Sequence, residues 1–172
     1  VRETAALAMG ISAVASEKAL DHLVALSLDS VAGRELSGGN VHHRTSAFAL
    51  YGLGLYSNQH HDPMVQRRAL DTMRSVLEDK SILDRNLKVA AIQGMGLLAL
   101  DKSDAATLAM LYEALDSLRR YYTMRAGHGR QFVQSNCPNA ITKLIGRDHP
   151  RRGDFIRLFV NDLKGKNKHR RG

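Results

Sequence analysis

The sequence predicts an all-α protein built from a repeated pair of helices, and three observations support this fold class. The 172-residue chain is rich in Ala and Leu, lacks Trp and has only three Pro, a composition that favours helices over sheets. A short motif returns at a constant offset of 42 residues. Each copy of the motif is followed by a segment whose apolar residues recur at helical spacing.

The repeated motif ends in glycine and occurs at Ala5–Gly10, Ala47–Gly52 and Val89–Gly94. Three segments at one offset are typical of a helical-repeat protein. A fourth, degenerate copy is expected at Asn139–Gly146, displaced by an insertion near residues 124–131. The sequence therefore predicts one domain of about four helix pairs, at approximately residues 1–33, 41–80, 84–122 and 132–165, with a basic tail at 165–172.

A second amphipathic helix is expected after each copy of the motif. The clearest covers Met64–Glu78, where Val65, Ala69 and Met73 share one face. On its opposite face the spacing predicts two ion pairs between residues four apart, Arg67–Asp71 and Arg74–Glu78. The other second helices are expected near Glu17–Leu28, Asp104–Tyr122 and Asp154–Lys164.

Glycines within the first helices need an explanation, because a glycine inside a helix costs about 1 kcal/mol relative to alanine. Small residues let neighbouring helix axes approach closely, and tight packing then offsets that cost. Alternatively, the glycines end the helices. A membrane helix-dimer face is disfavoured because the segments are too short. The residues concerned are Gly52, Gly54, Gly94 and Gly96.

The connection Asp29–Val41 is long and rich in Gly and Ser, so we expect a mobile loop there. In repeat proteins insertions gather on one surface, which often binds the partner. The alternative is a tolerated surface insertion without a role.

The longest apolar stretches, near Phe48–Tyr56 and Val89–Leu100, fall short of the roughly 18–20 residues that span a membrane. We therefore expect no membrane segment. The single cysteine, Cys137, excludes an internal disulfide and a multi-cysteine zinc site, which favours a reducing, cytoplasmic location. The chain starts at Val1 within a helical pattern and without an N-cap residue, so we expect an excerpt of a longer protein.

The net charge of +8 is distributed unevenly. Residues 1–100 hold 10 basic and 10 acidic residues, whereas residues 101–172 hold 15 and 7. The neutral N-terminal part and the basic C-terminal part suggest that the C-terminal part has an anionic partner, either nucleic acid or an acidic protein. The candidate binding residues are Arg119, Arg120, Arg125, Arg130, Arg147, Arg151, Arg152, Arg157 and Lys164.

Two simpler explanations compete with a binding role. Basic residues at the C-terminal end of a helix are favoured by the helix dipole, which accounts for Arg119 and Arg120. A terminal run of Lys and Arg is often only solvated. Aromatic residues are few in this region, so stacking on single-stranded bases is poorly supported.

The first motif also resembles a known family. Val1–Gly10 reads V-R-E-T-A-A-L-A-M-G and is similar to the first helix of HEAT repeats, and Leu87–Gly94 resembles a diverged copy. The repeat length falls in the range of HEAT and armadillo-like proteins. The resemblance covers residues 1–122 well and 132–165 poorly. It lacks the usual aspartate before the V-R pair, has longer loops, and carries Pro138 in the last repeat.

The resemblance implies a right-handed α-solenoid of stacked antiparallel helix pairs. Members of this family are mostly interaction scaffolds, and a minority are enzymes or nucleic-acid binders. A relation to the HEAT-like alkylpurine DNA glycosylases is disfavoured, because those enzymes use aromatic residues and an acid, whereas this chain has no Trp and no assignable acid.

No residue pattern predicts catalysis, a cofactor or a small-molecule substrate. The pairs His42-His43 and His60-His61 flank a helix about 27 Å long and cannot share one metal ion. His128 is expected in a flexible insertion. No base is identified for Cys137, and no phosphate-binding glycine loop occurs.

The leading prediction is a non-enzymatic scaffold module that presents a concave or end surface to another protein or to the rest of its own chain. The alternative is a nucleic-acid or polyanion binder that uses the basic C-terminal residues.

Overall fold

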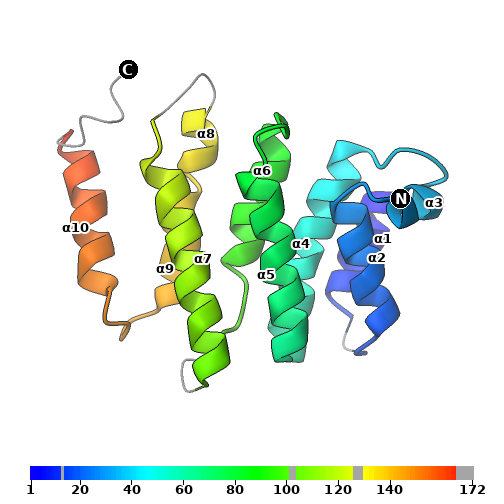
Figure 1. Ribbon diagram of the computed structural model, residues 1–172, viewed down its shortest axis with the longest axis horizontal. Coiled ribbons are helices and arrows are strands. Elements are labelled where there is room, and N and C mark those ends of the chain that lie inside the picture. Colours follow the sequence, from blue (N-terminus) through cyan, green and yellow to red (C-terminus); the bar gives the residue numbers. More distant parts are fainter. Residues whose placement is uncertain (13, 101–103, 126–129, 166–172) are drawn as a thin grey trace.

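The computed structural model describes residues 1–12, 14–100, 104–125 and 130–165, and within them the chain is all-α, with no β-strand (Figure 1). The all-α part of the predicted fold class is confirmed. The helices are α1 (Arg2–Gly10), α2 (Glu17–Ser27), α3 (Val31–Ser37), α4 (His43–His60), α5 (Pro63–Glu78), α6 (Arg85–Met95), α7 (Ala105–Thr123), α8 (Arg130–Gln134), α9 (Cys137–Ile145) and α10 (Arg152–Leu163).

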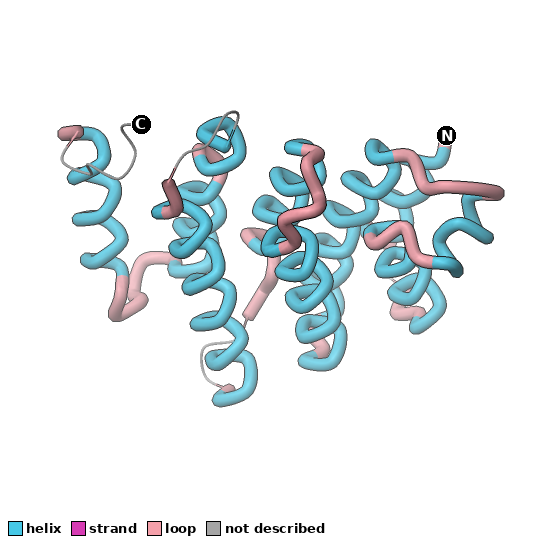
Figure 2. Tube along the Cα trace, turned by 45° about the horizontal axis from the view of Figure 1, so that its top comes forward, coloured by secondary structure: helices cyan, strands magenta, loops and turns pink. Residues whose placement is uncertain are grey.

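The longer helices lie side by side in two rows. In Figure 1, α2, α5, α7 and α10 form the front row, and α1, α4, α6 and α9 lie behind them. Within the back row α4 packs on both α1 and α6, and α6 packs on α9. In the turned view of Figure 2 the described chain consists of these helices joined by loops. The apolar core lies between the two rows.

Most helices begin where the sequence supplies a capping side chain. The carboxylates of Asp62, Asp84 and Asp104 accept hydrogen bonds from backbone amides at the starts of α5, α6 and α7. The hydroxyls of Ser16 and Ser30 do the same for α2 and α3. Each cap satisfies an amide that has no partner inside its helix, which stabilises the helix by about 1 kcal/mol.

Glycines in the back row allow close approach of neighbouring helices, as the first explanation predicted. A Cβ added to Gly10 would lie 2.4 Å from the backbone of Gly52, and one added to Gly54 would lie 2.6 Å from the carbonyl oxygen of Gly94. Both distances are shorter than real Cβ atoms tolerate. The crossings of α1 with α4 and of α4 with α6 therefore require glycine.

Gly96 follows the second explanation, because α6 ends at Met95 and Gly96 is its C-cap residue. The apolar segment 97–100 does not continue the helix. α4 instead runs through Gly52 and Gly54 to His60. Gly96 also lies close to α9, since an added Cβ would be 2.8 Å from the Cα of Ala140.

The connection at residues 29–41 is not the loop that we expected. It contains α3, which begins at the Ser30 cap and ends at Gly38 in the left-handed conformation. Asp29, at the start of the segment, contacts both its middle and its end. Its carboxylate pairs with Arg34 at 2.9 Å and accepts a hydrogen bond from the Val41 amide at 2.9 Å. The prediction of a loop was wrong because α3 is defined by the residues that cap its two ends, and apolar periodicity does not reveal caps.

No helix in the described part of the chain is long and apolar enough to cross a membrane. The insertion residues 126–129, which include His128, lie outside the described residues, as do residues 166–172 of the basic tail.

Candidate functional site

The basic residues singled out in the sequence lie at two opposite ends of the helix rows. One group, at the C-terminal part of α7 and the start of α8, is at the top of Figure 1 and comprises Arg119, Arg120, Arg125 and Arg130. The other, in the turn before α10 and at its start, is at the bottom and comprises Arg147, Arg151 and Arg152. Arg157 lies on α10, and Lys164 directly follows it. These cations do not form one continuous ridge.

Three of these cations are neutralised by acidic side chains. Their pairs are Arg120–Glu78 at 3.1 Å, Arg151–Asp116 at 2.9 Å and Arg157–Asp154 at 2.5 Å. Among the described residues, the other six have no acidic partner. Arg151 also packs its guanidinium over the rings of Tyr112 and Phe155, at 5.8 and 5.6 Å from their centres. Its role is therefore to hold α10 against α7.

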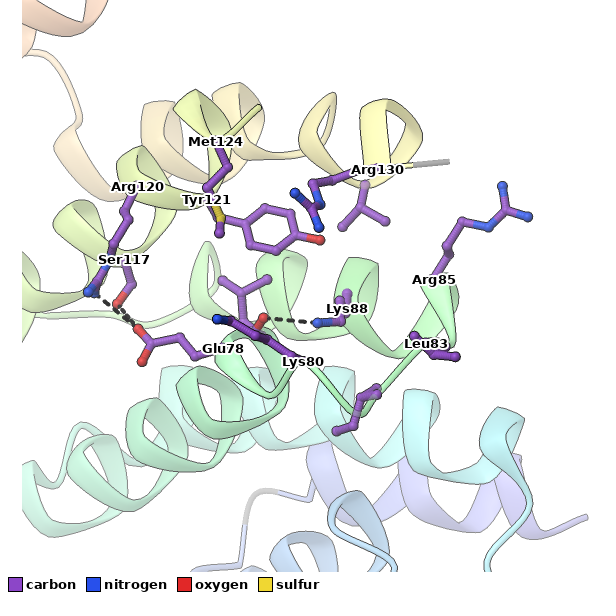
Figure 3. Close-up of a pocket in the computed structure, with 13 residues that line it drawn as sticks. Glu78, Lys80, Leu83, Arg85, Lys88, Ser117, Arg120, Tyr121, Met124 and Arg130 are labelled. Carbon is purple, nitrogen blue, oxygen red and sulfur yellow. Dashed lines mark hydrogen bonds and ion pairs between the residues drawn. The ribbon is translucent and has the colours of Figure 1, made fainter. Parts of the chain in front are cut away.

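A cavity of about 410 Å³ lies beside the first of the two groups. Its walls come from the end of α5, the connection to α6, the start of α6, the C-terminal part of α7 and α8 (Figure 3). The cavity is lined by five cations and one acid, which are Lys80, Arg85, Lys88, Arg120, Arg130 and Glu78. We call it the cationic pocket.

Glu78 does not neutralise the pocket, because it is already engaged at one side of it. Its carboxylate accepts a hydrogen bond from the Ser117 hydroxyl at 2.9 Å and pairs with Arg120 at 3.1 Å. Arg74 approaches it at 3.8 Å, so the predicted pair within α5 is present. The remaining four cations have no acidic hydrogen-bond or ion-pair partner among the described residues.

Lys88 is held at the inner side of the pocket by the end of α5. Its ammonium donates hydrogen bonds to the carbonyl oxygens of Leu77 at 3.2 Å and Asp79 at 2.8 Å. Carbonyls at the end of a helix have no partner within it, and a cation is favoured there. Lys88 therefore stabilises the C-terminal end of α5. Burial lowers the pKa of Lys88, and the charge of Arg130 lowers it further, whereas Asp79 opposes this shift.

Tyr121 forms the floor of the pocket between these two cations. The Lys88 ammonium lies 5.9 Å from the centre of the Tyr121 ring. In Figure 3 the hydroxyl end of Tyr121 is directed towards Lys88 and the guanidinium of Arg130. Burial raises the pKa of Tyr121, while the nearby positive charge of Arg130 opposes that rise. The phenol therefore stays protonated near neutral pH and can donate a hydrogen bond.

Exposed apolar side chains lie at the mouth of the pocket and beside it. Leu83, which lines the pocket, is 85% exposed. Phe132, which is 56% exposed, lines a shallow neighbouring hollow together with Leu83, Asp84 and Arg85. Met124, at the end of α7, is 39% exposed. Large apolar groups next to a group of cations are typical of a surface that receives a partner rather than bulk water.

Sequence reasoning identified Arg120 and Arg130 but missed the rest of this site. Lys80, Arg85 and Lys88 belong to the front part of the chain, where equal numbers of acids and bases suggested neutrality. The neighbouring acids accept their hydrogen bonds elsewhere: Asp79 accepts from Ser81, and Asp84 caps α6, although the charge of Asp79 still acts on the pKa of Lys88. Only the fold shows that these three cations form no ion pair with the acids next to them in the sequence.

The other candidate groups lie where the sequence suggested. His43 starts α4 and contacts Asp84 at 3.1 Å, and His60 ends α4 and contacts the Ser12 carbonyl at 3.2 Å. In the described part of the chain no group of His, Cys, Asp and Glu could hold a metal ion. Cys137 is fully buried at the start of α9.

No protein-family model, no curated protein and no solved structure matches this chain.

Proposed function

We propose that the chain is a non-enzymatic protein-interaction module of the HEAT-repeat type, and that it binds an acidic segment of a partner protein at the cationic pocket. In this proposal the pairs α1/α2, α4/α5, α6/α7 and α9/α10 stack as a right-handed solenoid of about four repeats. The observation that carries the proposal is the pocket itself, where cations from α6, α8 and the connection before α6 meet without acidic partners.

The stacking is supported by contacts between residues about one repeat apart. Ser16 and Tyr56 exchange hydrogen bonds across 40 positions, and Tyr122 bonds to Asp162 across 40. Arg68 pairs with Asp21 across 47 positions. The last two contacts join second helices of neighbouring pairs, and the first joins the start of α2 to α4 of the next pair, as nearest-neighbour stacking in a repeat architecture produces.

The pocket favours an acidic protein segment because it combines charge with apolar surface. Carboxylates of such a segment would meet Lys80 and Arg85 at the rim, and its apolar side chains would cover Leu83, Phe132 and Met124. Charge complementarity of this kind sets specificity and the association rate, and the apolar contacts supply most of the affinity.

Charge reversal at the pocket tests this proposal against general electrostatic attraction. Binding of a labelled peptide of glutamate and leucine is measured by fluorescence polarisation for K80E/R85E and for a matched control, R147E/R152E, at the other end of the molecule. We expect the pocket variant to weaken binding at least about tenfold, and the control to change it little. Equal losses in both variants, or no loss in either, would refute the proposal.

A second candidate is binding of nucleic acid, which the exposed cations outside the pocket favour. Arg119, Arg125, Arg147, Arg152 and Lys164 are exposed and have no acidic partner among the described residues. Phosphate backbones bind such residues without base contacts, with an affinity that falls steeply with salt. The same two variants separate the candidates, since a duplex that uses both ends would lose affinity in both. Absence of duplex binding at low salt removes this candidate.

A further inference from the structure

The net positive charge of the side chains that line the cationic pocket exceeds what a single carboxylate can neutralise. Of its five cations only Arg120 is paired, and the Glu78 carboxylate that pairs with it is also engaged by Ser117 and Arg74. A single carboxylate carries one negative charge. A phosphorylated side chain carries about −1.5 to −2 at neutral pH and offers three acceptor oxygens.

Hydrogen-bond donors from three helices remain available at the floor of the pocket. Lys88 on α6 uses two of its three ammonium protons on the carbonyls of Leu77 and Asp79. Arg130 on α8 gives one bond, to the Arg125 carbonyl at 2.9 Å, and keeps its other N–H groups. The Tyr121 hydroxyl on α7 has no hydrogen-bond partner among the described residues.

These donors are held together although two of them repel each other. Burial is the main cause that lowers the pKa of Lys88, the charge of Asp79 opposes it, and the nearby charge of Arg130 lowers it further. Holding two cations in this way costs free energy that Asp79 offsets only in part, and an anion bound between them would offset more of it. Two hydrogen bonds at the end of α5 hold the Lys88 ammonium at this position.

We propose that the cationic pocket receives the dianionic phosphoryl group of a phosphorylated side chain on the partner, with Lys88, Arg130 and the Tyr121 hydroxyl as its donors and Arg85 at the rim. This inference rests on the proposed function and names the modification that regulates binding. Recognition of phosphorylated segments by clustered cations follows the same physical rule.

A protein segment fits this pocket better than a nucleic-acid backbone does. Leu83 and Met124 at the mouth, and Phe132 in the hollow beside it, would contact the apolar neighbours of a phosphorylated residue. A duplex backbone presents no apolar groups there. A volume of about 410 Å³ accommodates one phosphorylated side chain rather than a run of nucleotides.

The first experiment compares two tetrahedral anions that differ in charge. Phenyl phosphate and phenyl sulfate are titrated separately into the whole chain by NMR at pH 7.4 and constant ionic strength. We expect phenyl phosphate to bind about tenfold more tightly and to shift the signals of Tyr121 and Arg130. Equal affinity for the monoanionic sulfate would overturn the inference.

A pair of neighbouring arginine variants then locates the site. R130Q removes a donor that lines the pocket, whereas R125Q removes an exposed arginine whose side chain does not line it. We expect R130Q to weaken phenyl phosphate about tenfold and R125Q to leave it unchanged. Identical behaviour of the two variants contradicts the assignment, and their circular dichroism spectra check that both remain folded.

A final pair of peptides separates this inference from the proposed function. The glutamate and leucine peptide is compared with the same peptide in which one glutamate is replaced by phosphoserine. Tighter binding of the phosphorylated peptide, lost in R130Q, supports the phosphoryl site. If both bind equally and K80E/R85E weakens both, the proposed function stands and the phosphoryl inference fails. If neither binds, both fail.

Discussion

Residues without side chains set the distance between neighbouring helices of the back row. At the crossing of α4 and α6 the backbones touch at Gly54 and Gly94, and the carbonyl oxygen of Leu50 also approaches Gly94. A methyl group at this point would have to displace backbone, which cannot move without shifting a whole helix. Glycine lowers the stability of the isolated helix, but it allows close packing of α4 on α6 that a larger residue would prevent.

Alanine at position 54 tests this account. The new Cβ would lie 2.6 Å from the Gly94 oxygen, so we expect G54A to lower the free energy of unfolding by about 1–3 kcal/mol, despite the better helix propensity of alanine. Urea denaturation measures the change.

The matched control is G153A in α10. The nearest heavy atom to its added Cβ is the end of the Arg157 side chain at 3.8 Å, so this variant should be neutral or slightly more stable. If G54A were as stable as the wild type, the helices would be able to separate freely, and close packing would not explain the glycine.

Single residues also show where prediction from the sequence succeeds and where it stops. The repeat offset placed Gly52 and Gly54 inside a helix, because periodicity is a local property of the chain. The sequence could not assign Lys88 to the cationic pocket, because Arg130 and Tyr121, which lie beside it there, are more than thirty positions away along the chain. Charge counted along the sequence does not reveal which cations lose their acidic partners on folding.

At the scale of helices, α5 and α7 are joined by a network of charged groups. Arg67 of α5 makes two hydrogen bonds to the Glu113 carboxylate, at 2.7 and 3.1 Å, and Arg74 adds a third at 2.9 Å. The predicted pair of Arg67 with Asp71 is present at 3.4 Å but is longer than these contacts. Helical spacing predicted the pair within α5, whereas the bonds between α5 and α7 required the fold.

Replacement of Glu113 by glutamine tests the network through its pH dependence. Hydrogen bonds from Arg67, followed by the charges of Arg67 and Arg74, lower the pKa of Glu113. A carboxyl group with a lowered pKa in the folded state stabilises the fold above its unfolded pKa, and this contribution is lost as the pH falls through the folded pKa. We expect E113Q to be less stable by about 1 kcal/mol at pH 7, where half-exposed pairs are screened by solvent.

The difference between the two proteins should then shrink as the pH falls from about 5 to about 3. Chemical denaturation at each pH provides the comparison. E35Q serves as the control, because Glu35 is exposed and forms no ion pair among the described residues. A stability gap between wild type and E113Q that stays constant with pH would show that the charge of Glu113 is not responsible.

Across the whole molecule, burial decreases from the central helices to α10. α4 and α5 together contribute Leu50, Leu53, Leu70 and Met73 to the core, all fully buried. In α10 the only buried residue is Phe155, and Leu163 is 87% exposed. The sequence predicted α10 from its apolar spacing. It could not predict how little of that apolar face is covered, because burial depends on which helices lie next to it.

Hydrogen exchange should follow this gradient. Helices with few buried contacts open locally at little cost in free energy, whereas central helices exchange only through larger openings. We expect the amides of α10 to exchange fastest among the longer helices, and those of α4 and α6 slowest, in exchange measured by mass spectrometry or NMR. F155A should accelerate exchange in α10 and leave α4 unchanged, because Phe155 is the one buried residue of α10. Protection of α10 equal to that of α4, or slower exchange in α10 than in α4, would contradict this account. Such a result would mean that the whole molecule unfolds as one unit, with Tyr122–Asp162 and Arg151–Asp116 coupling α10 tightly to α7.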